Sequence, residues 1–266
     1  MKDYLKELVL GEEELSARNL TREYLQSRIL REFQLAGAMA TLAFHGDTCL
    51  RFIYGLPRYS EDLDFALEIR SAGYDLEGYL RKAQSQLLKE AYQVEAYVRQ
   101  HRKAHRGLIR FPGLLHDLGL SPLPSETLAI RIEVDTNPPS AATTEVKVSR
   151  RHIPLRLFCH DRATLLAGKI HAILQRSYAK GRDWYDLIWY LSAADWPEPN
   201  IGMLNAALLQ TDPSPPFLTE HTWRQSVLQR MHELDWNAVT NDVIPFLADQ
   251  REIDLINKND IERILV

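Results

Sequence analysis

The sequence predicts an α+β protein, with a mixed sheet and flanking helices in residues 1–158 and helices alone in residues 159–266. Two observations carry this prediction. In the first part, apolar and polar residues alternate in several short stretches, which is the period of a strand with one buried face. In the second part, apolar residues recur at helical spacing instead. The pattern changes near residues 155–160, where we place a domain boundary.

The clearest strand pattern is at residues 128–136, where Ile130, Ile132 and Val134 face one way and Glu133 faces the other. A sheet of about five strands is expected, a usual number for a domain of this size. The stretches predicted to contribute strands to it are 58–67, 92–98, 108–111 and 128–136.

Helical spacing predicts helices on both sides of these strands. Thr21 is placed as the N-cap of a helix that ends near Gly37, after a shorter helix within residues 1–19. Asp161 is expected to cap a helix over residues 162–177 in the same way. The other predicted helices cover residues 74–91, 182–191, 201–210, 220–234 and 243–250.

Length and composition exclude several classes of protein. The chain has 266 residues, 45% of them hydrophobic, which is enough for a packed core and excludes global disorder. A net charge of −4 excludes a strongly basic nucleic-acid-binding protein, although it is compatible with a local basic patch. The two cysteines, Cys49 and Cys159, lie far apart, which argues against a cysteine zinc site. Cys49 is expected to be a small core residue.

The charged N-terminal segment lacks the apolar stretch of a signal peptide. No part of the sequence approaches the run of about 18 apolar residues that a membrane-spanning helix needs. We therefore expect a cytoplasmic protein that makes no use of a membrane.

The chemistry is expected around Ser60-Glu61-Asp62-Leu63-Asp64. If this segment is a strand, Ser60, Asp62 and Asp64 share one face, and the two carboxylates lie roughly 7 Å apart at their Cα atoms. Such a pair suits Mg²⁺, with Mn²⁺ as the alternative, because hard cations prefer oxygen ligands. The competing interpretation is a solvated strand face, which is the commoner origin of an isolated Asp-x-Asp pattern.

A turn precedes this segment at Gly46-Asp47-Thr48, and an apolar run typical of a short helix follows the turn. A helix N-terminus attracts phosphate, so the turn is a candidate phosphate site. Together with Arg58, Ser60 and the aspartate pair, this arrangement resembles the one used by nucleotidyltransferases of the polymerase-beta type. In those enzymes a glycine turn and a serine hold the triphosphate while two aspartates hold metal.

Two further features of the first part remain open between two interpretations. The run at residues 99–106 is the most basic in the chain and is either a solvated hairpin tip or a patch for nucleic-acid phosphate. Glu133 is either a third carboxylate beside the aspartate pair or part of the solvent face of an edge strand.

In the second part, Lys169 and Arg176 are spaced seven residues apart, so they share one helix face. Asp183 and Asp186 share a face of the next helix. Taken alone, Lys169 reads as a surface lysine and Asp183 as a first-turn carboxylate favoured by the helix dipole. If Lys169 is functional, it is expected to contribute little to stability, and Asp186 is expected to matter less for activity than Asp183.

The order of these motifs resembles the AbiEii/AbiGii-type toxin family of nucleotidyltransferases, which includes the MenT-type toxins. The resemblance covers about residues 20–195. It rests on Arg-x-Ser-x-Asp-x-Asp from Arg58 to Asp64, on Arg-Ile-Glu-Val from Arg131, and on Arg-Asp-Trp-Tyr-Asp-Leu from Arg182.

The resemblance implies a polymerase-beta-like core followed by helices. It implies transfer of a nucleotide from a nucleoside triphosphate with Mg²⁺ to an RNA acceptor, for which tRNA is expected. It also implies a toxin of a toxin–antitoxin or abortive-infection system with a cognate antitoxin. The implied catalytic residues are Asp62, Asp64, Lys169 and Asp183. The implied nucleotide-binding residues are Gly46, Thr48, Arg58, Ser60 and Lys169, and the implied metal ligands are Asp62, Asp64 and Glu133.

The family's turn is usually Gly-Gly-Thr, and Asp47 stands where its second glycine would be. Its carboxylate is expected to point away, to contact metal, or to weaken triphosphate binding. Two alternative functions therefore stay open. One is a metal-dependent nuclease, and the other is a catalytically impaired module that binds a nucleotide or a partner protein.

Overall fold

A computed structural model describes residues 2–69, 73–101 and 104–265. Contacts along the chain group it into two compact units. Unit 1 comprises Met1–Gly55, Tyr59–Pro138 and Val146–Cys159, and unit 2 comprises Leu56–Arg58, Pro139–Glu145 and His160–Val266. The sequence predicts two domains, residues 1–158 and 159–266, and that division stays a prediction.

Among the described residues, a seven-stranded mixed sheet in the order β3-β4-β5-β2-β1-β7-β6 organises the first unit. Its strands are β1 (Leu42–His45), β2 (Leu63–Leu67), β3 (Glu95–Gln100), β4 (Ala104–Pro112), β5 (Thr127–Asp135), β6 (Thr144–Ser149) and β7 (Leu155–His160). β2 lies between β1, to which it is antiparallel, and β5, to which it is parallel. The α+β class that the sequence predicts is confirmed.

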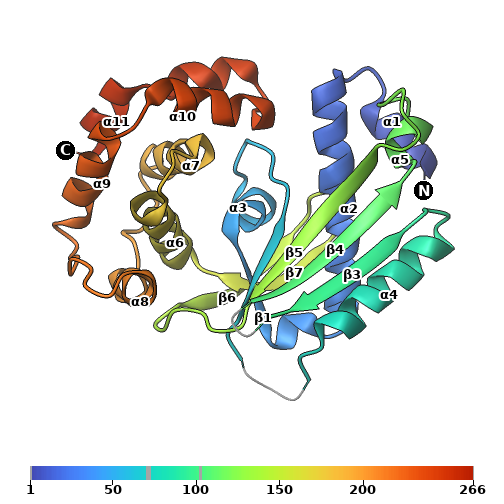
Figure 1. Cartoon of the computed structure of the whole chain (residues 1–266), viewed down its shortest axis with the longest axis horizontal. Coiled ribbons are helices and arrows are strands. Elements are labelled where there is room, and N and C mark those ends of the chain that lie inside the picture. Colours follow the sequence, from blue (N-terminus) through green and yellow to red (C-terminus); the bar gives the residue numbers. More distant parts are fainter. Residues whose placement is uncertain (1, 70–72, 102–103, 266) are drawn as a thin grey trace. The chain divides into compact units, whose positions relative to one another are not determined.

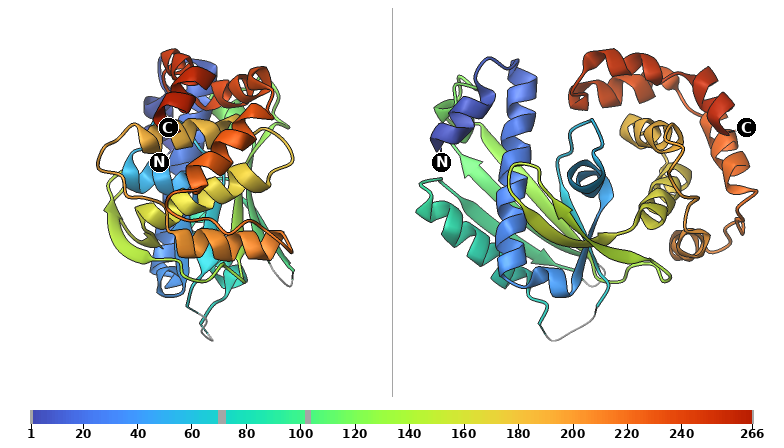
Figure 2. Two further views of the ribbon diagram at one scale, coloured as in Figure 1. Left: turned by 90° about the vertical axis from the view of Figure 1, so that its left-hand side faces the viewer. Right: turned by 180° about the vertical axis from the view of Figure 1, so that it is seen from behind.

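One face of this sheet is apolar because the strands alternate as predicted. Leu63 and Phe65 of β2 pair in register with Ile132 and Val134 of β5, and all four side chains are fully buried. Phe65 also stacks on Phe33 of helix α2 (Glu14–Leu35), with ring centroids 5.8 Å apart. Helices α2 and α4 (Leu76–Lys89) cover this face (Figures 1 and 2). No helix in the described part of unit 1 is drawn over the other face of strands β3 to β5, which we call the open face of the sheet.

The remaining helices of unit 1 are short: α1 (Lys2–Val9), α3 (Gly46–Cys49), α5 (Leu114–Asp117), a 3-10 turn (Ala38–Ala40) and a π-helical turn (Leu50–Tyr54). The predicted helix start at Thr21 is wrong. Helix α2 begins at Glu14, and Thr21 is buried inside it, where its hydroxyl donates to the carbonyl of Ala17 at 2.8 Å. A threonine can bond the preceding turn in this way, so its presence does not require a helix end.

The predicted strand at 58–67 is shorter than expected, since β2 begins at Leu63. Ser60 and Asp62 therefore lie in the loop before it. The expected number of about five strands is also too low: the described residues form seven, and β1, β6 and β7 had no predicted counterpart. Cys49 is fully buried, as predicted.

Unit 2 contains six α-helices among its described residues: α6 (Arg162–Gln175), α7 (Gly181–Leu191), α8 (Ile201–Thr211), α9 (Trp223–His232), α10 (Trp236–Val243) and α11 (Lys258–Leu265). Asp161 caps α6 as predicted, accepting from the amide of Thr164 at 2.9 Å. The predicted helix over 243–250 is wrong. Pro245 follows the end of α10, and the chain continues in 3-10 turns at Ile244–Phe246 and Gln250–Leu255. Proline cannot donate the backbone bond that a continuing helix needs.

Gly181 at the start of α7 allows a close approach of two helices. A Cβ atom there would lie 1.8 Å from the carbonyl oxygen of Val239 in α10. Only glycine fits, so the first turn of α7, which carries Asp183, is tied to α10.

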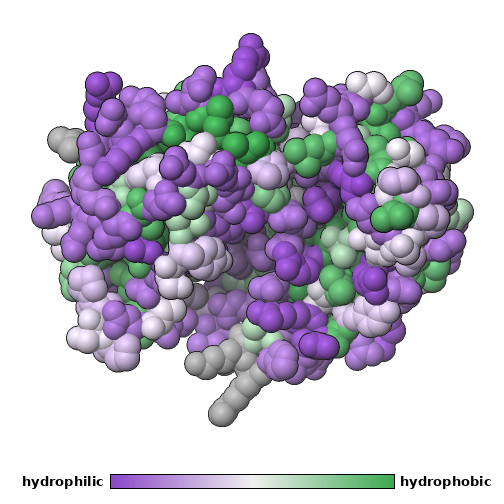
Figure 3. All heavy atoms as spheres, turned by 45° about the horizontal axis from the view of Figure 1, so that its top comes forward, coloured by the Kyte–Doolittle hydropathy of each residue, from purple (hydrophilic) through white to green (hydrophobic). Residues whose placement is uncertain are grey.

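Hydrophilic residues dominate the face drawn in Figure 3, with hydrophobic side chains in smaller groups between them. Among the described residues, no helix has the length and the apolar character that crossing a membrane requires. Scattered apolar side chains of this kind are usual on a protein surface.

Candidate active site

Three carboxylates gather on the open face of the sheet in unit 1. Asp64 of β2 and Glu133 of β5 are register partners on adjacent parallel strands, which lie about 4.8 Å apart. Asp62 precedes β2 by one residue. Because Leu63 and Phe65 are buried on the helix-covered face, Asp64 points to the opposite face. The side chain of Asp62 is 34% exposed and that of Glu133 is 45% exposed, so both are open to solvent and ligand.

Two of these carboxylates are paired with arginines from the same face. Arg131 of β5 donates its Nε to Oδ1 of Asp62 at 3.0 Å. Arg106 of β4 places its Nε 3.2 Å from Oε1 of Glu133. The hydrogen bond to Asp62, and the charge of that carboxylate, raise the pKa of Arg131. Arginine thus occupies carboxylate oxygens that a cation would need.

Residues that are register partners form one row across the sheet. Arg99 of β3 pairs with Arg106, Arg106 with Glu133, Glu133 with Asp64, and Asp64 with His45 of β1. The predicted basic run at residues 99–106 therefore belongs to the β3–β4 hairpin. Its residues 102 and 103 lie outside the described residues. Side chains at register positions share a face, so two of its arginines lead toward the carboxylates.

The loop before β2 is held by the turn that follows β1. Thr48 is fully buried, and its hydroxyl bonds both the hydroxyl of Ser60, at 2.8 Å, and the backbone carbonyl of Asp62. Gln26 of α2 donates to the carbonyl of Ser60 at 3.1 Å. These bonds fix the position of Asp62 at the end of the loop, directly before β2.

Gly46 brings the turn close to Asp64. Its φ of 73° is in the left-handed region, and a Cβ atom there would lie 2.6 Å from Oδ2 of Asp64. Any other residue would displace this carboxylate or the turn. Asp47 follows in the first turn of α3.

The donor set of Asp62, Asp64 and Glu133 fits a hard divalent cation. All three offer oxygen, the ligand that Mg²⁺ and Mn²⁺ prefer, and none offers sulfur or imidazole. Their exposure leaves room for the waters that Mg²⁺ retains.

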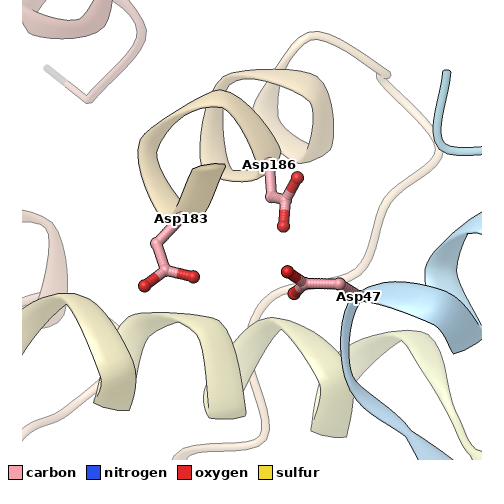
Figure 4. A group of neighbouring side chains, drawn as sticks. All are labelled: Asp47, Asp183 and Asp186. Carbon is pink, nitrogen blue, oxygen red and sulfur yellow. The ribbon is translucent and has the colours of Figure 1, made fainter. Parts of the chain in front are cut away.

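A second charged cluster is buried in unit 2. Nζ of Lys169 lies 2.8 Å from Oδ1 of Asp183 and 2.7 Å from Oδ2 of Asp186. Arg176, directly after α6, places its Nε 2.9 Å from the other oxygen of Asp183. Figure 4 draws Asp183 and Asp186 on one side of α7 with both carboxylates turned toward α6. Lys169 is 7% exposed, so the alternative of a surface lysine is excluded.

Arg58 belongs to this second cluster. Its side chain is fully buried, and its Nε and Nη2 donate to the two oxygens of Asp186, at 2.6 and 2.5 Å. This is the bidentate geometry that guanidinium and carboxylate favour. In this arrangement Arg58 holds a carboxylate.

The predicted site residues therefore fall into two groups. Unit 1 brings together Gly46, Thr48, Ser60, Asp62, Asp64 and Glu133, and unit 2 brings together Arg58, Lys169 and Asp183. Sequence reasoning missed that Arg106 and Arg131 pair with the carboxylates of unit 1 and that Asp186 binds Arg58 and Lys169. For Asp186 a signal existed, because its i,i+3 spacing from Asp183 places both on one helix face.

Comparisons with known proteins identify the family and the fold of the chain. A family model described as nucleotidyl transferase AbiEii toxin, type IV TA system, matches residues 28–264. A search of curated proteins finds no match.

Two solved structures from Helicobacter pylori are similar. JHP933 is 16% identical with a TM-score of 0.52, covering 93% of this chain and 91% of its own. A candidate nucleotidyltransferase is 15% identical with a TM-score of 0.53, covering 92% and 94%. At this identity the likeness shows the fold alone, and with the family match it confirms the predicted nucleotidyltransferase fold.

Proposed function

Since the chain belongs to the AbiEii family of nucleotidyl transferase toxins from type IV toxin–antitoxin systems, we propose that it transfers a nucleotide from a nucleoside triphosphate to an RNA acceptor. The acceptor class we propose is tRNA, and the proposed place of action is the cytoplasm. A cognate antitoxin protein would restrain the activity. The observation that carries the proposal is the register of Asp64 with Glu133, beside Asp62, on the open face of the sheet.

Asp62, Asp64 and Glu133 are the proposed metal ligands, with Mg²⁺ as the metal and Mn²⁺ as a substitute. A divalent cation of this kind, when bound, lowers the pKa of an attacking hydroxyl and offsets charge on the leaving pyrophosphate. The protein's own contribution is to hold the carboxylates in place. Thr48 holds Asp62 through its hydrogen bond to the backbone carbonyl of that residue. Gly46 has no side chain, so it leaves space for the carboxylate of Asp64.

Gly46, Thr48 and Ser60 are proposed to form the triphosphate side of the site. Because the carbonyl of Asp62 accepts the one hydroxyl proton of Thr48, Ser60 donates to Thr48 in turn, and the hydroxyl of Ser60 would have to turn from Thr48 to donate to a phosphate oxygen. Arg58 is proposed to support nucleotide binding indirectly, by holding Asp186 in place through bonds to both of its carboxylate oxygens.

Lys169 and Asp183 are proposed to act in the same reaction. The cluster of Arg58, Lys169, Arg176, Asp183 and Asp186 contains three cations and two carboxylates. A cation that carboxylates hold in place is preorganised to bind a phosphate of the substrate. Lys169 would offset charge on the phosphates, and Asp183 would orient Lys169 through their 2.8 Å contact.

Incubation of the purified protein with total RNA and each α-labelled nucleoside triphosphate in turn tests this function. Label on a discrete RNA band is expected with Mg²⁺, and not with a chelator or with the Asp64→Asn variant. A band of tRNA length would support the proposed acceptor. Shortened, unlabelled RNA would show that the protein is a nuclease and not a transferase. Nucleotide binding without any product would identify an inactive module.

A further inference from the structure

We propose that Arg106 and Arg131 exchange partners during the reaction: each leaves its carboxylate when a divalent cation binds there, and each then binds a phosphate of the RNA acceptor strand. Metal and RNA would therefore bind cooperatively. This inference rests on the proposed function, because it takes Asp62, Asp64 and Glu133 as the metal ligands.

The ion pairs can exchange because they are on the surface. The side chains of Arg106 and Arg131 are each 61% exposed, and their contacts to Glu133 and Asp62 measure 3.2 and 3.0 Å. Pairs of this exposure are weak. Metal binding needs the same oxygens, so a bound cation displaces the guanidinium groups.

A displaced guanidinium beside a divalent cation is repelled by it and needs an anion. Phosphate is the appropriate partner, since a guanidinium presents parallel N–H groups that match two phosphate oxygens. While the carboxylates are free of metal, their charges repel phosphate from this face. Bound metal removes that repulsion and makes both arginines available to RNA.

The rest of the open face favours an RNA strand over the triphosphate as the source of phosphate. Arg99 continues the line of arginines beyond Arg106, three strand spacings from Asp64, or roughly 14 Å. It is exposed and has no ion-pair partner among the described residues. Tyr97 is 50% exposed two residues earlier on the same face, where a base can stack on its ring. A strand that runs over Tyr97, Arg99 and Arg106 reaches the carboxylates with its end.

The test measures binding, so it does not depend on turnover. Affinity for a single-stranded RNA oligonucleotide is measured over a range of salt concentrations, with and without Mg²⁺, for wild type, Arg106→Gln and Arg131→Gln. Affinity for Mg²⁺ is measured by calorimetry without RNA. Arg31→Gln is the matched control, because Arg31 is an exposed arginine on α2, which covers the other face of the sheet.

Each substitution is expected to change the two affinities in opposite directions. Mg²⁺ should bind about two- to fivefold more tightly, since no surface ion pair has to be broken first. RNA should bind more weakly with Mg²⁺ present, and the slope of log affinity against log salt should fall by about 0.7, because each variant neutralises one RNA phosphate fewer. By linkage, RNA should tighten Mg²⁺ binding in wild type by more than in either variant. Arg31→Gln should match wild type throughout.

Unchanged affinities in both variants would overturn the inference, and so would weaker binding of Mg²⁺ in them. A loss of nucleoside triphosphate affinity with RNA affinity unchanged would assign the arginines to the donor, and a loss confined to binding of an antitoxin protein would assign the face to a protein partner. Each of these two results would also overturn the inference that the arginines bind RNA. Asp64→Asn separates this failure from failure of the proposed function: if that variant binds Mg²⁺ as wild type does, the metal site itself is wrong.

Discussion

Asp64 on β2 and Glu133 on β5 are direct neighbours across two parallel strands, although 69 positions separate them in the sequence. Their register follows from the buried pairs on either side, Leu63 with Ile132 and Phe65 with Val134. A slip of β2 by one residue would move Asp64 to the apolar face while Glu133 of β5 stayed on the open one. The packing of the core therefore fixes the spacing of the proposed metal ligands.

Glu133→Gln is expected to weaken Mg²⁺ binding by at least about tenfold, since it removes a proposed ligand. The melting temperature should hardly change, because the ion pair with Arg106 that the variant lacks is exposed. Calorimetric titration with Mg²⁺ measures the effect. Glu95→Gln is the control, because Glu95 is also a carboxylate of this sheet that pairs with an arginine, Arg110, at 3.5 Å. Equal affinities in the two variants would remove Glu133 from the ligand set.

Gly46→Ala is expected to abolish most activity, because the new Cβ atom would displace Asp64. Gly37→Ala separates this effect from backbone strain. Gly37 has a similar φ of 85°, but no atom lies within 4 Å of the position of its Cβ. Both variants should lose about 1 kcal/mol of stability from the left-handed backbone. Only Gly46→Ala should lose nucleotide transfer in a single-turnover assay. Equal activity in the two would show that Asp64 tolerates displacement.

Lys169→Met is expected to lower both stability and activity. Lys169 is buried between two carboxylates, and its removal leaves them close together without their shared cation. Breaking such a buried group costs about 3–5 kcal/mol. This replaces the expectation from the sequence that a functional Lys169 would contribute little to stability. Denaturant unfolding, together with activity at a temperature where the variant is folded, separates the two effects. Full activity in the folded variant would make Lys169 purely structural.

Asp186→Asn is expected to destabilise the protein by a similar amount. The expectation that Asp186 matters less for activity than Asp183 is a separate one and stays a prediction. Asp186 is fully buried and binds both Lys169 and Arg58. The loss of its charge leaves two buried cations with too few carboxylates. Asp195→Asn is a suitable control, since Asp195 pairs with Arg162 at the surface. A melting temperature equal to that of the control would contradict the burial argument.

Acid is expected to unfold unit 1 through Glu23. Burial raises the pKa of this carboxyl, but the hydrogen bond with His152 and the charges of Arg51 and Arg151 outweigh burial and bring the pKa to about 2. The pKa is thus lower in the folded protein than in the unfolded chain. The stabilisation is complete above about pH 4.5 and is lost as the pH falls toward 2.

The shift corresponds to about 3 kcal/mol. Unfolding free energies of wild type and Glu23→Gln between pH 7 and pH 2 measure it. The variant should be less stable at pH 7 and should lose less stability with acid. Parallel pH profiles for the two proteins would exclude Glu23 as the main acid-sensitive group.

Local patterns predicted the parts of the fold that depend on neighbours in sequence. The alternation in β5 and the cap at Asp161 are of this kind. Thr21 misled because a threonine can cap a helix or bond within one, and only the packing of α2 decides between them. The strands β1, β6 and β7 were missed, and β6 buries only Ser149 among its six residues.

The pairs that build the two clusters could not be predicted from local pattern. Arg58 and Asp186 are 128 residues apart, and the sequence around either residue gives no sign that the two form a pair. Arg131 and Asp62 form a pair only because β5 lies beside β2 in the sheet. The residue types of the site were therefore predictable, while their partners depend on the topology.

Single-turnover transfer of an α-labelled nucleotide to RNA by Asp62→Asn and Asp64→Asn tests the central claim most directly. Glu13→Gln is the control, because Glu13 is an exposed carboxylate before α2 whose side chain makes no capping bond. Both aspartate variants should lose at least about a hundredfold in rate, comparable to the loss of one preorganised charge-stabilising group. Their melting temperatures should equal that of wild type or slightly exceed it, since removing one of two adjacent like charges relieves repulsion. Near-normal transfer by either variant would contradict the assignment and return the aspartate pair to a solvated face of the sheet.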